Sequence, residues 1–238
     1  MTTNNRFSGS IGDDYDLFKL AVPHFDELQD EIDRIVSAHY KLQSYPSPYR
    51  VIEIGCGSGE TTRRILEANR NISVFALDND PAMLEQARRN LALFSERVQF
   101  VCGDALSELR DLKKDADFQA VVSGFTLHNF QHEYRKSLVG ELARHLAPDG
   151  LYVNADKYAP DDSVTHEKDL SEQLKAFKIF DEVGRPDLRE AWTNHYYEDE
   201  NTKWTEFNEK SLLRVNGFGD IKIVYRNHME AIITASKQ

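Results

Sequence analysis

The chain has 238 residues, a length typical of one α/β domain with a substantial buried core. Its 40 acidic residues outnumber its 29 basic residues, and the resulting net charge of -11 opposes binding to nucleic acid and favours a small-molecule partner. No segment approaches the roughly 20 apolar residues that cross a bilayer, and the polar start lacks the apolar core of a secretory signal, so we expect no membrane partner and a cytoplasmic location.

The first part of the chain predicts helices, and the central part predicts βαβ units. An amphipathic pattern runs from Tyr15 to Leu42 and is interrupted by Pro23, which predicts two helices lying over the domain. Short apolar runs then alternate with helical patterns, which is typical of strands feeding a parallel sheet. The expected strands are 50–54, 72–77, 98–102, 118–123 and 151–155, and the expected helices between them are 60–69, 81–93, 105–112 and 132–146.

The regular alternation stops after Tyr158, where a polar, charged and aromatic stretch runs to about Lys203. We interpret this stretch as an insertion. A helix at 206–215 and two strands at 221–225 and 231–235 follow, and the strands are close enough to pair as an antiparallel hairpin at the sheet edge. The predicted fold is therefore α/β, doubly wound around a mostly parallel seven-stranded sheet, as a single domain. Its expected parts are an N-terminal helical lid (1–45), a cofactor-binding core (46–158), a helical insertion after the fifth strand that forms a substrate lid (159–203), and a final helix and hairpin (204–238).

Three glycines, Gly55, Gly57 and Gly59, stand between the first expected strand and the first helix. Glycine lets the backbone turn sharply there and lets a ligand approach without a Cβ in the way. A dinucleotide fingerprint needs its third glycine three positions after the second, and Glu60 occupies that position. The spacing argues against NAD or FAD and favours a ligand with a ribose but no phosphate.

Two carboxylates flank this loop in the expected fold. Asp78 ends the second strand, where it can accept hydrogen bonds from both hydroxyls of a ribose, and Glu53 can pair with a cationic amino group at the other end of the ligand. A ligand that joins methionine to adenosine meets both demands. We expect Cys56 and Cys102 to be buried free thiols, and the cysteines have no zinc-site spacing, so no metal is expected.

With these motifs the chain resembles the class I S-adenosylmethionine-dependent methyltransferases, strongly over residues 46–158. The resemblance implies a Rossmann-like transferase with S-adenosylmethionine as cofactor and S-adenosylhomocysteine as product. It implies that Gly55, Cys56 and Gly57 cradle the methionine part and that Asp78 binds the ribose. It also places Asn79 and Met83 near the adenine, Asp104 and Ala105 at the exocyclic amine, and the Gly124, Phe125 to Leu127 stretch behind the sulfonium.

Within that superfamily the chain is most similar to the carboxy-S-adenosylmethionine synthases and their tRNA-modifying relatives. Shared features are Tyr15-Asp16, the segments 22–25, 78–83 and 125–127, and the spacing from Gly184 to Gly217-Phe218. The resemblance implies that Phe25 closes over the cofactor, and Tyr15 is expected to face the same pocket.

The synthases hold an extra carboxylate of their cofactor with an arginine in the insertion. An ungapped alignment puts Asn194 at that position, although Arg185 or Arg189 could serve instead. A neutral amide cannot provide the charged, bidentate clamp of an arginine, so the sequence favours ordinary methyl donation.

Methyl transfer from a sulfonium is an in-line displacement, so positioning can supply much of the rate, and a base helps when the acceptor is a hydroxyl or an ammonium. His128, just past the fourth strand, is the first candidate base, and His195 in the insertion is the second. An alternative is that His128 caps the next helix or faces solvent. The residues expected near the acceptor are Lys157, Tyr158, Trp192, Asn194, Tyr196 and Tyr197, unless the aromatic rings pack the insertion onto the sheet.

The leading hypothesis is a methyltransferase that acts on an oxygen or nitrogen of a small molecule, beneath lids formed by residues 1–45 and 159–203. The alternatives are a tRNA-modifying methyltransferase, a carboxy-S-adenosylmethionine synthase-like enzyme, an S-adenosylmethionine-binding protein without catalysis, and an NAD oxidoreductase. The fold alone does not determine the acceptor, and a homodimer is left open.

Overall fold

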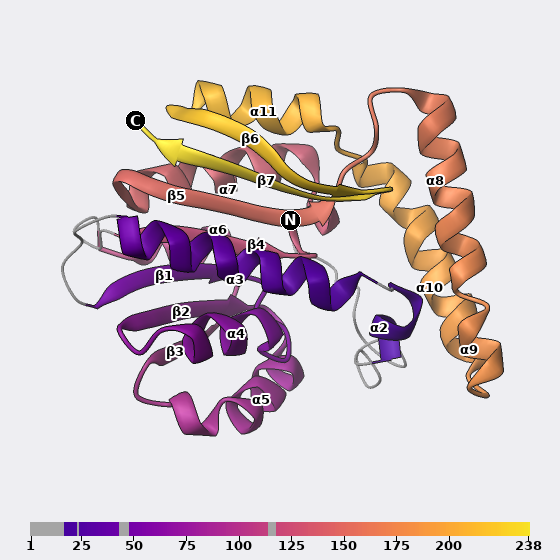
Figure 1. Ribbon diagram of the computed structural model, residues 1–238, viewed down its shortest axis with the longest axis horizontal. Coiled ribbons are helices and arrows are strands. Elements are labelled where there is room, and N and C mark those ends of the chain that lie inside the picture. The colour runs from indigo at the N-terminus through magenta and orange to yellow at the C-terminus, as the bar shows by residue number, and fades with distance from the viewer. Residues whose placement is uncertain (1–16, 23, 43–47, 114–117) are drawn as a thin grey trace.

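A seven-stranded sheet with helices on both faces organises the chain (Figure 1). The computed structural model describes residues 17–22, 24–42, 48–113 and 118–238. The strand order is β3-β2-β1-β4-β5-β7-β6. The strands are β1 (Tyr49–Ile54), β2 (Ile72–Asp78), β3 (Val98–Cys102), β4 (Phe118–Gly124), β5 (Leu146–Lys157), β6 (Phe218–Asn227) and β7 (Glu230–Lys237).

The direction of the strands creates the place where a ligand can bind. Strands β1 to β5 pair in parallel, whereas β7 runs antiparallel to β5 and β6 runs antiparallel to β7. Strands β2 and β3 lie on one side of β1, and β4 lies on the other side, so the strand order reverses between β1 and β4. Open α/β sheets bind ligands in the crevice at the carboxyl ends of the strands at such a reversal. The predicted mixed sheet and its terminal hairpin are confirmed.

Strand side chains alternate between two hydrophobic clusters, one on each face of the sheet. Tyr49 and Val51 of β1 pack with α3 (Phe25–Leu42) and α4 (Glu60–Ala68), whereas Ile52 and Ile54 pack with α7 (His132–His145). Helix α3 buries apolar residues three or four positions apart, which gives it one apolar stripe along the sheet. The remaining helices are α2 (Phe18–Ala21), α5 (Pro81–Asn90), η2 (Ala92–Phe94), α6 (Ala105–Asp111), η3 (Leu127–Asn129) and α11 (Glu206–Val215).

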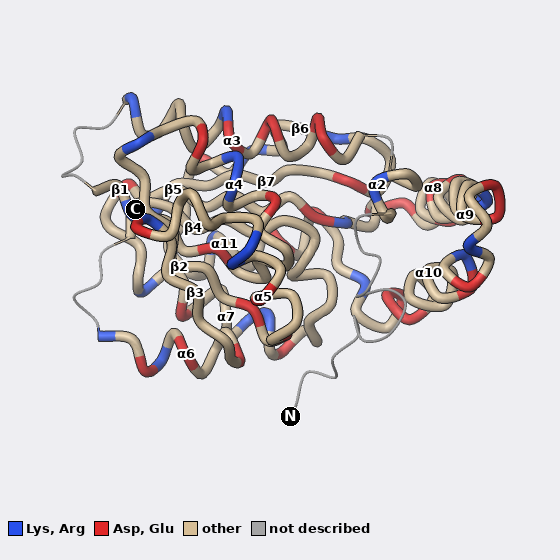
Figure 2. The backbone as a smooth tube through the Cα atoms, turned by 90° about the horizontal axis from the view of Figure 1, so that it is seen from below, with Lys and Arg blue, Asp and Glu red and all other residues tan. Residues whose placement is uncertain are grey.

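The insertion folds into helices that stand beyond the carboxyl end of β5 (Figure 1). They are α8 (Ser163–Ala176), α9 (Ile179–Glu182) and α10 (Pro186–Asp199), and α10 leads into the short helix η4 (Glu200–Thr202). Figure 2 shows α8, α9 and α10 as a group that projects from the body of the sheet. None of the helices in the described part of the chain combines the length and apolar character needed to span a bilayer.

Several details differ from the sequence-based expectations. Strand β5 begins at Leu146 rather than at residue 151, because Leu146 already pairs with Phe118 ahead of a bulge. Cys56 is buried as expected, but the prediction for Cys102 is wrong, since this thiol lies on edge strand β3 and is exposed. Helices α2 and α3 flank Pro23, which itself lies outside the described residues.

Candidate functional site

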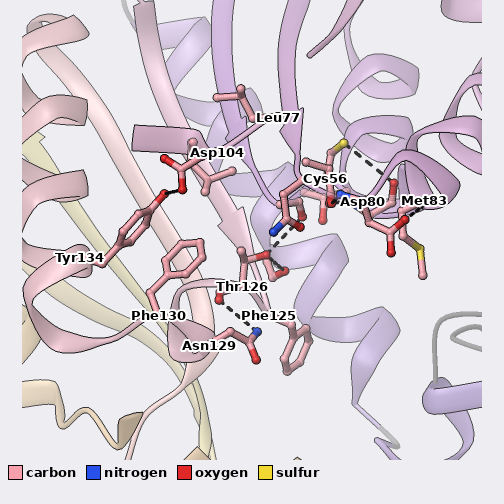
Figure 3. Close-up of a pocket in the computed structure, with 18 of the residues that line it drawn as sticks. Cys56, Leu77, Asp80, Met83, Asp104, Phe125, Thr126, Asn129, Phe130 and Tyr134 are labelled. Atoms are coloured by element: carbon pink, nitrogen blue, oxygen red, sulfur yellow. Dashed lines mark hydrogen bonds between the residues drawn. The ribbon is translucent and has the colours of Figure 1, made fainter. Parts of the chain in front are cut away.

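A cavity of about 620 Å³ opens at the carboxyl ends of β1, β2, β3 and β4 (Figure 3). Each of these strands is followed by a short segment that lines the cavity. This volume suits a cofactor-sized ligand. The lining segments from the strand ends are 54–58, 77–80, 103–105 and 124–126.

The glycine loop after β1 needs its glycines for two different reasons. Gly55 and Gly57 both have positive φ, 69° and 52°, a conformation that side chains rarely adopt. A Cβ on Gly55 would lie 2.2 Å from Oγ1 of Thr126, whereas a Cβ on Gly57 would meet no atom within 4 Å. Gly55 therefore permits close packing against the end of β4, and Gly57 leaves space open in the cavity.

Asp78 at the end of β2 is held in place by backbone groups. Its Oδ2 accepts a hydrogen bond from the N–H of Gly57 at 2.8 Å, and its Oδ1 accepts one from the N–H of Asp80 at 2.9 Å. Burial raises the pKa of Asp78 above its usual value, and the two N–H donors oppose that shift. Each carboxylate oxygen has further acceptor capacity, so Asp78 can also receive ribose hydroxyls.

Asp104 lies at the end of the next strand and forms part of a small network. Its Oδ1 accepts a hydrogen bond from the N–H of Ser107 and so caps α6, and its Oδ2 accepts one from the hydroxyl of Tyr134 at 2.9 Å (Figure 3). Burial raises the pKa of Tyr134, so the phenol keeps its proton and acts as the donor. Sequence reasoning missed Tyr134, which comes from the first turn of α7.

Most of the residues expected at the cofactor line this one cavity. They are Phe25, Gly55, Cys56, Gly57, Asp78, Asn79, Met83, Asp104, Ala105, Gly124 and Phe125. The ring of Phe25 stacks on that of Phe125 with centroids 5.7 Å apart, so α3 and the end of β4 together form an aromatic wall. Tyr15 lies outside the described residues.

Glu53 does not line the cavity, which corrects the expectation that it meets the ligand. Its side chain is buried with 1% exposure, and its carboxyl group accepts a hydrogen bond from the hydroxyl of Thr62 on α4. Burial raises the pKa of Glu53 to about 8, so the carboxyl stays protonated near neutral pH. Glu53 therefore joins β1 to α4 as a neutral group.

The aromatic residues of the insertion pack the helices together rather than lining the cavity. Trp192 stacks on Phe18 of α2 at 4.2 Å, and Tyr196 packs edge-on against Phe177. Asn194 and Tyr197 are exposed, and Tyr158 is buried with its hydroxyl bonded to Asn154. The expectation that these residues line the acceptor site is therefore wrong for Trp192, Tyr196, Asn194, Tyr197 and Tyr158, and the packing alternative explains the rings.

Other residues also line the cavity. They follow β4 and the end of α10, and sequence reasoning did not select them. The polar residues interspersed with apolar ones over 126–133, after the fourth strand, were the signal that could have found the first group. These residues are Asn129, Phe130, Gln131, Glu133, Glu198, Asn201 and Thr202.

His128 occupies a separate, buried position. Its Nδ1 lies 2.6 Å from Oδ1 of Asp156, and its backbone N–H donates to the other oxygen of Asp156. His128 lines a second cavity of about 20 Å³, and Thr202 lines both cavities. The expected place of His128 at the mouth of the crevice is thus wrong, because η4 lies between the two spaces. Burial, together with the charge of Lys157, lowers the pKa of His128.

Lys157 and His195 belong to the same buried cluster as His128. The ammonium of Lys157 donates a hydrogen bond to Asp199 and lies over the ring of Tyr196, 3.7 Å from its centroid. His195 packs edge-on against Trp192, and its Nε2 lies 3.7 Å from Oδ1 of Asp199. Neither Lys157 nor His195 lines the larger cavity.

All charged side chains among the described residues that line the larger cavity are acidic. They are Glu60, Asp78, Asp80, Asp104, Glu133 and Glu198. The two arginines considered as partners for an extra cofactor carboxylate do not line this cavity. Arg185 pairs with Asp187, and Arg189 pairs with Asp181. The described wall of this cavity therefore attracts cations and offers no guanidinium to an anion.

Comparison with known proteins agrees with this architecture. Residues 51–150 match the family of methyltransferase domains. A carboxy-S-adenosyl-L-methionine synthase of Shewanella pealeana is 26% identical over 230 residues, which cover 93% of this chain and 88% of the relative.

Solved structures share the fold at low sequence identity. The CurJ carbon methyltransferase matches with a TM-score of 0.64 and 14% identity, covering 87% of this chain and 53% of that chain. PigF with SAH matches with a TM-score of 0.54 and 16% identity, covering 79% and 50%. The chain thus spans about half the length of these two solved chains.

The fold and the strand-end cavity define an α/β protein with a ligand-sized cavity at the carboxyl ends of its parallel strands. The domain match over residues 51–150 and the similarity to the synthases indicate an S-adenosylmethionine-dependent methyltransferase, with S-adenosylmethionine as the cofactor.

Proposed function

We propose that the protein transfers the methyl group of S-adenosylmethionine to an oxygen or nitrogen atom of a small molecule. The observation that carries the proposal is one cavity lined by two kinds of segment. The strand-end loops with Gly57 and Asp78 line it, and so do polar side chains from η4 and from the segment after β4. The first set suits the cofactor, and the second set is available to an acceptor.

The first set of lining residues fits S-adenosylmethionine. Asp78 is anchored by two N–H donors and can accept the ribose hydroxyls, and Gly57 leaves open the space that a Cβ would occupy. Met83 and Asp104 would contact the adenine, and Phe125 would lie behind the sulfonium. When bound, the cofactor supplies an activated methyl group for in-line displacement.

The charge of the cavity favours methyl donation over carboxymethyl chemistry. An extra carboxylate on the cofactor needs a cationic partner, and no lysine or arginine lines the described part of the cavity. Asn194, at the aligned arginine position, is exposed on α10 outside the cavity. The same acidic lining disfavours the tRNA-modifying alternative, because it repels phosphates.

The proposed chemistry rests on positioning rather than on a base in the cavity. No histidine lines the cavity within the described residues, so the protein's contribution is to hold the acceptor in line with the methyl group. Asn201 and Thr202 of η4 and Phe25 of α3 line the cavity from the insertion and from the N-terminal helices. We therefore assign both segments the role of lids that exclude water from the transfer.

Turnover with a panel of acceptors tests this function. The purified protein is incubated with S-adenosylmethionine and with phenols, primary amines or carboxylic acids, and the release of S-adenosylhomocysteine is measured. We expect release with at least one phenol or amine. Tight cofactor binding without release for any acceptor would support the alternative of a binding protein, and release driven by tRNA alone would support the modifying enzyme.

A further inference from the structure

Three potential metal ligands meet in the buried cluster behind η4. Helix α10 presents His195 and Asp199 on one face because they are four residues apart, and η3 supplies His128. One donor atom from each residue lies within 4.8 Å of the others, and all three side chains are buried. This grouping could not be predicted from spacing, because His128 is distant in the chain from His195 and Asp199.

Two of the separations between these side chains are slightly longer than those of a tetrahedral site. Nε2 of His128 lies 3.9 Å from Oδ2 of Asp199, and Nε2 of His195 lies 3.7 Å from Oδ1 of the same carboxylate. A zinc ion with bonds of about 2.1 Å separates its donors by about 3.4 Å. The two imidazoles face different oxygens of Asp199, and the three donor atoms lie within 4.8 Å of one another, so side-chain shifts of about 1 Å would bring them to a common ion.

A carboxylate behind His128 orients it as a metal ligand. Nδ1 of His128 lies 2.6 Å from Asp156, whose other oxygen accepts the backbone N–H of His128. A histidine that donates its Nδ1–H to a carboxylate leaves the lone pair of Nε2 available, which is the usual arrangement around metal-bound histidines. Nε2 of His128 is the atom that faces Asp199.

The cluster also has room for one more ligand. His128 and Asp199 both line the cavity of about 20 Å³, a volume that holds about one water molecule. Three protein ligands with a water in the fourth position are typical of open zinc sites. The fourth position would thus lie on the side of the cluster nearest η4.

Lys157 competes with a metal ion for the carboxylate of Asp199. Its ammonium donates to Asp199, so the carboxylate already has a cation as partner. Lysine has a long and flexible side chain, and a divalent ion can take over the same carboxylate while gaining two imidazole bonds. Metal affinity should therefore be limited by the cost of displacing the ammonium.

We propose that His128, His195 and Asp199 bind a divalent transition metal ion of the zinc type, with water as fourth ligand, in exchange for the ammonium of Lys157. The two imidazoles and one carboxylate suit zinc or cobalt better than magnesium or calcium. A bound ion would tie α10 of the insertion to the segment that follows β4, and so fix one wall of the larger cavity. This site is independent of the proposed acceptor.

Cobalt(II) titration of the full chain, after dialysis against a chelator, tests the site. We expect one Co²⁺ per chain with the intense visible absorption of a tetrahedral complex, lost in H195Q and D199N. K157M should raise the Co²⁺ affinity at least about tenfold, because the competing ammonium is removed. H166Q is the matched control, since His166 lines the same small cavity but is not one of the three ligands.

Calorimetry with S-adenosylmethionine on every variant shows that the variant is folded, and it keeps this test separate from that of methyl transfer. Tetrahedral absorption that persists in H195Q, or that disappears equally in H166Q, would overturn the proposal. So would absorption seen only in K157M, because Lys157 would then keep the natural site closed.

Discussion

The carboxylate of Asp78 accepts a hydrogen bond from the backbone N–H of Gly57 over 2.8 Å. This bond joins the end of β2 to the loop after β1, so the two features expected to grip opposite ends of the cofactor form one unit. A second bond, from the N–H of Asp80, fixes the other carboxylate oxygen. Because the carboxylate is already oriented, the entropy cost of ordering this side chain when the ribose binds is small.

Alanine substitutions in the glycine loop should show which glycine is needed for stability and which is needed for binding S-adenosylmethionine. G55A places a Cβ against Thr126 and should lower the free energy of unfolding by about 2 kcal/mol or more. G57A meets no protein atom, so its stability loss should be about 1 kcal/mol from backbone strain, while affinity for S-adenosylmethionine falls at least about tenfold. Urea unfolding and calorimetry measure the two effects.

Gly184 provides the control for these substitutions. Its φ is also positive, at 75°, its Cβ would meet nothing within 4 Å, and it does not line the cavity. G184A should lose stability as G57A does and bind the cofactor normally. Equal binding losses in G57A and G184A would contradict the assignment of Gly57.

Glu53 should make stability depend on pH. Its pKa is about 8 in the folded chain against 4.5 for an ordinary glutamate, so the folded protein retains a proton that the unfolded chain has lost. Between about pH 4.5 and 8 this group lowers the free energy of unfolding by up to about 1.4 kcal/mol per pH unit as the pH rises. Below about pH 4.5 both states are protonated, and the effect is absent.

E53Q removes this titration while keeping the shape of the side chain. Urea unfolding at pH 5, 6.5 and 8 should show that E53Q gains stability over the natural chain as the pH rises. A constant difference between the two proteins across this range would mean that Glu53 is ionised in the folded state.

The two cysteines should react at very different rates. Cys102 is exposed on edge strand β3, whereas Cys56 is buried and lines the cofactor cavity. A thiol reagent such as DTNB should therefore label one site rapidly and the other only slowly, and S-adenosylmethionine should slow the second further. C102S should abolish the rapid phase, and a rapid phase that survives in C102S would contradict this placement.

The insertion should act on the acceptor through η4 rather than through the exposed face of α10. N201A removes a side chain that lines the cavity and should raise the KM of an acceptor about tenfold with cofactor affinity unchanged. N194A changes an exposed asparagine outside the cavity and should leave both values unchanged. Steady-state kinetics with an acceptor found in the turnover panel provides the measurement. A raised KM in N194A and an unchanged KM in N201A would contradict this prediction and would support Asn194 as an acceptor-binding residue.

That one cavity would gather the residues proposed for the cofactor could be predicted because they are adjacent to strand ends. Asp78 ends a strand, and Gly57 and Asp104 come shortly after one; the apolar pattern of these strands is clear, and parallel strands bring their carboxyl ends together. The residues proposed for the acceptor could not be predicted in the same way. His128 also follows a strand, but η4 separates it from the larger cavity, and that separation depends on how the insertion folds back.

The rings of the insertion illustrate a second limit. Trp192 and Tyr196 are amphipathic side chains that serve equally well in a ligand site or in a helix interface, and only the position of Phe18 on α2 and of Phe177 at the end of α8 decides between these uses. Glu53 shows a third limit, since its residue type suggests a charged contact while burial keeps it neutral.

The most direct test is calorimetric titration of S-adenosylmethionine into the natural chain and into D78A. We predict binding at one site per chain, weakening of at least about 100-fold in D78A, and no binding of NAD to either protein. Equal affinity of the natural chain and D78A for S-adenosylmethionine, or binding of NAD in its place, would contradict the account.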